Sequence, residues 1–289
     1  MSFTLIIWLA SFVFGLQTIV GKLTAKYSLS NPWQLNFFWT TFNSLLVLII
    51  SLILGEARIP VNFFSFALAG LFLAIGNMLL TYSIYKLDIT VISPLFSLRT
   101  AFTAILGALF LGEIFSLFEY LLIGVIFLSG TLIKVDEKFS LKNFKLNDLK
   151  YGIACMLFLA LSGATIKIAS VEGTYWNNML WINLFTSLFL LTTIPLFIKD
   201  LKNTPIKKYV GALGYSLSGG FGRLLMFFGL GINATITTVV ISLPLSMLIT
   251  IPLSYIFPRL LEKHSTGVYL YRLLLATIMI VCSIKLSLR

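Results

Sequence analysis

The chain has 289 residues, of which 58% are hydrophobic and 11% are charged, and its mean hydropathy is +1.00. Ordinary soluble domains carry about 25% charged residues, so this composition excludes a soluble globular protein and predicts one that crosses a membrane several times. The net charge of +11 does not indicate nucleic-acid binding, because most Lys and Arg residues lie in short loops between apolar runs, as topology signals do.

Apolar runs along the chain predict ten transmembrane helices. In order they cover residues 3–21, 33–54, 63–85, 89–111, 116–135, 151–170, 177–198, 208–231, 234–257 and 266–286. One long polar stretch, KVDEKFSLKNFKLNDLK at 134–150, separates two halves of five spans each. We therefore predict an all-α integral membrane protein with a first repeat at 1–135, a basic linker at 136–150 and a second repeat at 151–289.

The two halves match each other at a constant offset of 145 residues, at which Lys22 falls on Lys167 and the stretch 88–113 falls on 233–258. Five crossings is an odd number, so the second half enters the membrane upside down relative to the first. The sequence thus predicts inverted repeats, the arrangement of many secondary transporters, with a substrate site at the repeat interface near the midplane.

Two arginines lie deep inside predicted spans: Arg99 follows Pro94 in span 89–111, and Arg223 lies within span 208–231. A charge at this depth is costly unless it faces a cavity or a partner. A guanidinium offers a planar fork to a carboxylate or phosphate, which favours binding of an anionic group. Alternatively, each arginine bonds backbone carbonyls freed by a nearby break such as Pro94 or Gly219-Gly220. Both interpretations remain open on sequence alone.

Further candidates for substrate binding are polar or aromatic side chains inside the predicted spans: Trp8, Gln17, Asn77, Tyr82, Lys167, Ser216 and Ser218. Gln17, Asn77, Tyr82 and the serines could instead form hydrogen bonds between packed helices. Trp8 could belong to an interfacial aromatic belt. Lys167 lies nearer a membrane edge and could extend its amine to the interface, as could Arg272.

Every carboxylate falls in a loop or at a span end, and the single histidine, His264, is in a loop. This leaves no acid–base pair, metal cluster or activated nucleophile, so we predict neither an enzyme nor a cofactor or metal site. A midplane site with two arginines and no carboxylate has a positive potential, which favours an anion or a zwitterion over a free cation.

Three stretches resemble EamA-type members of the drug/metabolite transporter superfamily. These are FVFGLQTIVGKLTAKYS at 12–28, with Gly15 and Lys22 at family positions, the segment 81–113 with its proline-containing span and closing Leu-Gly-Glu, and the matching segment 227–263. The resemblance implies ten spans in two repeats and a central cavity lined mainly by spans one, three, four, six, eight and nine. It also implies transport of metabolites such as amino acids, sugars, nucleotide sugars or organic cations.

The sequence therefore predicts a secondary transporter of a small polar metabolite, such as an amino acid or organic anion, by alternating access in the plasma membrane. The expected partners are the substrate and membrane lipids, without nucleic acid, and the expected state is a monomer or homodimer. The alternative is a flippase for lipid-linked sugars or a non-transporting scaffold subunit. Loop charges put both termini outside the cell, whereas the resemblance puts them in the cytoplasm.

Overall fold

The computed structural model describes residues 3–60, 62–111, 115–133, 146–169, 174–232, 240–241, 244–257 and 264–287, and within these ranges it contains helices and no strand. Eleven α-helices are present: α1 Phe3–Tyr27, α2 Pro32–Ile53, α3 Phe63–Lys86, α4 Ile89–Leu111, α5 Leu117–Leu132, α6 Leu146–Ala169, α7 Tyr175–Leu191, α8 Ile198–Asn203, α9 Tyr209–Ile232, α11 Leu245–Ile256 and α12 Thr266–Ser287. Six of them, α1, α2, α3, α4, α6 and α12, are long and apolar enough to cross a membrane. The chain is a multi-pass membrane protein.

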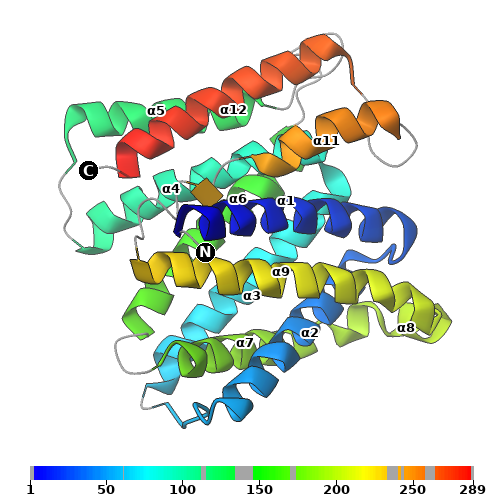
Figure 1. Cartoon of the computed structure of the whole chain (residues 1–289). Coiled ribbons are helices and arrows are strands. Elements are labelled where there is room, and N and C mark those ends of the chain that lie inside the picture. Colours follow the sequence, from blue (N-terminus) through cyan, green and yellow to red (C-terminus); the bar gives the residue numbers. More distant parts are fainter. Residues whose placement is uncertain are drawn as a thin grey trace.

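Helices from the two halves of the chain pack against each other throughout the bundle (Figure 1). α1 lies along α9, α3 lies along α6 and also packs on α7, and α5 lies along α12. α2 contacts both α7 and α9, and α4 contacts α6, α11 and α12. α1 begins and α12 ends at the same end of the bundle (Figure 1).

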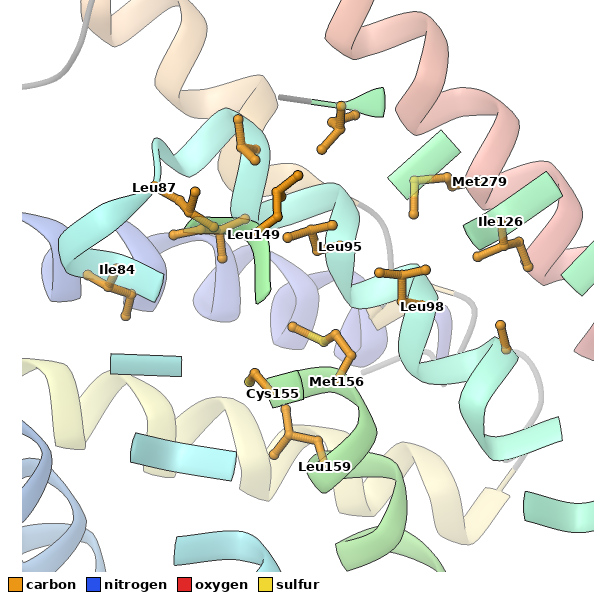
Figure 2. Packing of buried hydrophobic residues seen from close by; sticks show 14 of the residues in the cluster. Ile84, Leu87, Leu95, Leu98, Ile126, Leu149, Cys155, Met156, Leu159 and Met279 are labelled. Atoms are coloured by element: carbon orange, nitrogen blue, oxygen red, sulfur yellow. The ribbon is translucent and has the colours of Figure 1, made fainter. Parts of the chain in front are cut away.

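The main apolar core holds α4 in place from several sides. Leu98 on α4, Ile126 on α5, Met156 on α6 and Met279 on α12 are at most 1% exposed and belong to one cluster (Figure 2). Tight burial of this kind fixes side-chain positions, because protein interiors are packed about as densely as organic crystals. The residue after Leu98 is Arg99, so the core anchors the segment of helix that carries this charge.

A buried lysine caps the C-terminal end of α3. Lys22, on α1, is 7% exposed, and its Nζ donates to the main-chain oxygens of Ile84 at 3.0 Å and Leu87 at 2.8 Å. The last carbonyls of a helix lack partners within the helix, and the helix dipole makes them favourable sites for a cation. The sequence had singled out Lys22 through its match with Lys167, and the structure gives it a capping function.

The seventh predicted span, 177–198, is shorter than expected, since α7 ends at Leu191. The hydroxyls of Thr192 and Thr193 donate to main-chain oxygens within α7, at 2.7 and 2.6 Å, and Pro195 has no N–H to extend the helix. The chain then forms a 3-10 turn, Ile194–Leu196, and the unpredicted short helix α8. The described residues therefore hold 11 α-helices and not ten.

The ninth predicted span, 234–257, is described only in part. Its helix α11 begins at Leu245, directly after Pro244, and contains a second proline at position 252. Apart from residues 240 and 241, the segment between Ile232 and Pro244 lies outside the described residues.

Close packing of α3 on α7 depends on Gly70. A Cβ atom at this position would lie 2.6 Å from Cβ of Phe185 and 3.0 Å from the main-chain nitrogen of Thr186, neither of which can move without shifting α7. Gly124 on α5, in contrast, has no neighbouring atom within 4 Å of the place where its Cβ would stand.

We therefore expect Gly70→Ala to lower the free energy of unfolding by about 1–3 kcal/mol, because overpacking forces the two helices apart. Gly124→Ala is the matched control, and its better helix propensity should leave stability unchanged or raise it by up to about 1 kcal/mol. Thermal unfolding of both variants in detergent measures the difference. Equal effects of the two substitutions would contradict this account of the α3–α7 contact.

Candidate functional site

Two arginines from different halves of the chain approach each other inside the bundle. Arg99 on α4 and Arg223 on α9 are near enough to interact electrostatically. Nη2 of Arg99 lies 3.4 Å from the place where a Cβ atom of Gly163, on α6, would stand. The guanidinium carbon of Arg223 is 5.9 Å from the ring centre of Trp39 on α2. The pair thus occupies the meeting point of α2, α4, α6 and α9.

Both arginine side chains are accessible, and Arg223 lines a cavity. Arg99 lies deep in the bundle, yet its side chain is exposed, and Arg223 is half-buried. Among the residues that the structure describes, neither side chain has a hydrogen-bond or ion-pair partner. The alternative interpretation, in which they bond freed backbone carbonyls, is therefore not observed in the described part of the chain. Two neighbouring cations without a counter-charge attract an anion electrostatically.

A cavity of about 190 Å³ extends from Arg223 between α2, α7 and α9. One side of it is polar: Nδ2 of Asn43 donates to Oδ1 of Asn183 at 3.0 Å, and Nδ2 of Asn183 donates to the Met179 carbonyl at 2.8 Å. The remaining lining is mainly apolar and includes Leu46, Val47, Ile50, Leu217 and Leu224. The family resemblance had implied a cavity lined mainly by spans one, three, four, six, eight and nine. This cavity uses spans two, seven and eight, so that expectation does not describe it.

An aromatic wall supports Arg223 from the inside of the bundle. Trp39 and Tyr215 are each 2% exposed, and their ring centres are 5.0 Å apart. Nε1 of Trp39 donates to Thr81 at 3.4 Å, and the Thr81 hydroxyl lies 3.1 Å from Oδ1 of Asn36. A cation over an aromatic face is stabilised by the ring quadrupole. Trp39 is not among the candidates predicted from the sequence, although its place more than one turn inside span 33–54 is a signal that could have found it.

Two of the other predicted residues lie near this wall. Asn77 is buried on α3, one turn before Thr81 and hence on the same helix face, which is the face toward Trp39. Gln17 on α1 lies against α9, where its side-chain amide fills the space left by the missing side chain of Gly219.

The remaining candidates lie elsewhere or have other partners. Tyr82 packs edge-on against Trp33 at 5.7 Å and stacks on Tyr151 at 5.5 Å. Tyr151 precedes Gly163 on α6 by 12 residues, or about 18 Å along the helix axis, so this aromatic group is separate from Arg99. Trp8 is 44% exposed on α1.

The two serines of α9 differ from each other. The Ser218 hydroxyl donates to the Gly214 carbonyl of its own helix at 2.8 Å, and Ser216 is fully buried. Lys167 belongs to α6, but its side chain lies outside the described residues.

A second polar cluster joins the two halves at the end of the bundle where α3 meets α4. Nη2 of Arg272 lies 3.2 Å from Oδ2 of Asp88, Nε2 of His264 lies 2.9 Å from the same oxygen, and Nη1 of Arg272 donates to Thr90 at 2.5 Å. Arg272 is 2% exposed, and its pairing with Asp88 holds its charge at this end of the bundle. This cluster holds the α3–α4 connection against α12.

Comparison with known proteins finds a family match in the first half of the chain. Residues 1–135 match the model of the EamA-like transporter family, which is part of the drug/metabolite transporter superfamily. This half of the chain is therefore similar to EamA-type transporters. EamA is a family of transporters and not of enzymes, in agreement with the prediction from the sequence. A search of the curated proteins finds no match.

The fold of this chain also occurs in solved structures. One of them, described as "Crystal structure of protein", aligns with a TM-score of 0.60 at 12% sequence identity, covering 97% of this chain and 96% of the other. This likeness extends over both halves of the chain, whereas the family model matches only the first. At such low identity it is evidence about the fold alone.

Proposed function

We propose that this protein is a secondary transporter that binds the anionic group of a small metabolite, such as an organic acid or an amino acid, between Arg99 and Arg223. The observation that carries the proposal is the pair of accessible guanidinium groups that have no partner among the described residues. Their mutual repulsion and their removal from bulk water are both costly. A bound carboxylate or phosphate offsets both costs, because it neutralises the pair and accepts forked hydrogen bonds from each.

Alternating access between two inverted repeats is supported by how the helices pair. At the 145-residue offset, α1 corresponds to α6, α2 to α7 and α3 to α9. The contact of α1 with α9 then corresponds to that of α6 with α3, and the contact of α2 with α9 to that of α7 with α3. Contacts that correspond in pairs when the two halves are exchanged are typical of a pseudo-two-fold axis. Repeats 1–135 and 151–289 can rock about this axis. We place this transporter in the plasma membrane, as a monomer or homodimer.

Transport by purified protein in liposomes tests the function directly. We expect uptake or exchange of at least one carboxylate-bearing solute from a panel of amino acids, mono- and dicarboxylates, sugars and quaternary amines. Other carboxylates should compete with it, and quaternary amines should not, because the site is positive. Flux restricted to sugars or cations would overturn the proposal, as would the absence of flux across the whole panel.

A flippase for lipid-linked sugars is the second candidate, because the cavity reaches the surface of the bundle. Leu217 and Phe221, which line it, are 47% and 49% exposed. Transbilayer movement of a fluorescent anionic lipid in the same liposomes, measured by chemical quenching in the outer leaflet, would favour this candidate over a transporter of water-soluble metabolites.

A further inference from the structure

The cavity beside Arg223 has a polar end and an apolar end. Near Arg223, the paired amides of Asn43 and Asn183 contribute hydrogen-bonding groups. One to two turns further along α2, Val47 and Ile50 line the cavity together with Met179 of α7 and Leu224 of α9. From Asn43 to Ile50 the cavity follows two turns of α2, or about 10 Å.

This gradient fits an elongated amphipathic solute better than a compact polar one. A sugar or a dicarboxylate that filled the cavity would leave hydroxyl or carboxylate oxygens against the apolar wall, and buried polar groups without partners are costly. A hydrocarbon chain leaves nothing unsatisfied there, while an anionic group at the other end meets the Arg223 guanidinium.

We infer that the cavity between α2, α7 and α9 is the subsite for the apolar chain of an anionic substrate whose charged group binds at Arg223. The inference rests on the proposed function and narrows its substrate class from small anions to anions with a hydrocarbon tail. Each methylene buried in the cavity strengthens binding about fourfold. Affinity therefore rises with chain length until the 190 Å³ cavity is full, and then levels off.

Straight-chain monocarboxylates from propanoate to octanoate are the probes, titrated against the full-length protein in lipid nanodiscs. Trp176 lines the cavity, so its fluorescence reports binding. For the wild type we expect dissociation constants that fall severalfold with each added methylene over part of the series. Arg223→Ala should lower the affinity for acids of every chain length by a similar factor, since it removes the charge contact and leaves the apolar wall.

Ile50→Trp is designed to fill the apolar end of the cavity and should flatten the chain-length dependence while short acids still bind. Ile49→Trp is the matched control: it makes the same change at the preceding residue of α2, which is 52% exposed and does not line the cavity. This control should keep the wild-type dependence on chain length, including the part that comes from partitioning of the probe into the lipid. Val47→Trp is a second filling variant at the same end of the cavity, and it serves if Ile50→Trp does not fold.

The outcomes separate this inference from the proposed function. If short and long acids bind equally and both depend on Arg223, the transporter proposal stands and the tail subsite is wrong. If no acid binds and native mass spectrometry shows a phospholipid that Ile50→Trp displaces, the cavity holds a lipid chain and the inference is overturned. If no acid binds and no lipid is present, both proposals fail.

Discussion

Replacing Arg99 and Arg223 together by alanine is expected to abolish binding and transport of the anionic substrate while the protein stays folded. Each hydrogen bond to a charged group contributes about 1.5–3 kcal/mol, so each single alanine variant should lower affinity roughly 10- to 100-fold. Arg→Lys should restore only part of this, because a point charge does not reproduce the planar fork.

Stability distinguishes a binding role of these arginines from a structural one. Neither side chain has a hydrogen-bond or ion-pair partner among the described residues, so its removal should leave the thermal unfolding midpoint close to that of the wild type. Lys22→Ala is the contrasting variant. It removes a buried cation that bonds two carbonyls at the end of α3 and should lower stability by about 1–3 kcal/mol.

Transport assays with the double alanine variant in liposomes complete the test. A protein that moved a cation with undiminished activity after both replacements would show that the arginines do not form the substrate site. Strong destabilisation by Arg99→Ala or Arg223→Ala would point instead to bonds with the backbone.

Replacing Asp88 by asparagine is expected to have the largest effect on stability. The substitution removes the carboxylate that faces Arg272, which is 2% exposed, and His264. Breaking a buried ion pair by removing one partner costs several kcal/mol, because the other charge stays buried without compensation. Asp88 is 27% exposed, which reduces the penalty, and we expect a loss of about 3 kcal/mol.

The Asp88 cluster also bears on transport, because it joins the α3–α4 connection of the first half to α12 of the second. If the halves rock against each other, this end of the bundle opens only when the cluster separates. Asp88→Asn should therefore shift the population toward conformers open at this end, measurable as faster cysteine labelling of a probe placed there. Asp200→Asn, at a carboxylate of the short helix α8 that accepts from Asn31, is the control and should change neither stability nor labelling.

The same cluster makes stability depend on pH in the acid range. Burial by itself raises the pKa of Asp88, but the hydrogen bond with His264 and the charges of Arg272 and Lys22 outweigh this and lower it to about 2, from an ordinary value of 3.8. Because the folded state binds the proton more weakly than the unfolded state, the stabilisation is complete above about pH 4 and is lost as the pH falls toward 2.

A difference of this size corresponds to about 2 kcal/mol. Unfolding midpoints measured between pH 6 and pH 2.5 should decline more steeply for the wild type than for Asp88→Asn. Parallel curves for the two proteins would contradict the assignment of this pH dependence to Asp88.

The class of the protein follows from its amino-acid sequence alone. Its apolar runs, its loop charges and the lack of midspan carboxylates predict a multi-pass membrane protein. The stretches 12–28 and 81–113 indicate the EamA family, and the family model confirms this over residues 1–135. These properties can be predicted from the sequence, because a segment that crosses a bilayer must be a long apolar helix, however the helices pack. Arg99 and Arg223 were found for the same reason, since a charge stands out in an apolar run.

Which polar residues share a site depends instead on how the helices pack. Asn43 and Trp39 belong to α2 and Tyr175 to α7, helices that the family resemblance left outside the cavity. Their side chains meet Arg223 only because α2 packs on both α7 and α9. Membrane helices carry apolar side chains all round, so periodicity does not reveal which face is inward. For the same reason, the sequence did not predict that Arg272 pairs with Asp88, 184 residues away. Nor did it predict that Arg99 has no hydrogen-bond or ion-pair partner in the described structure.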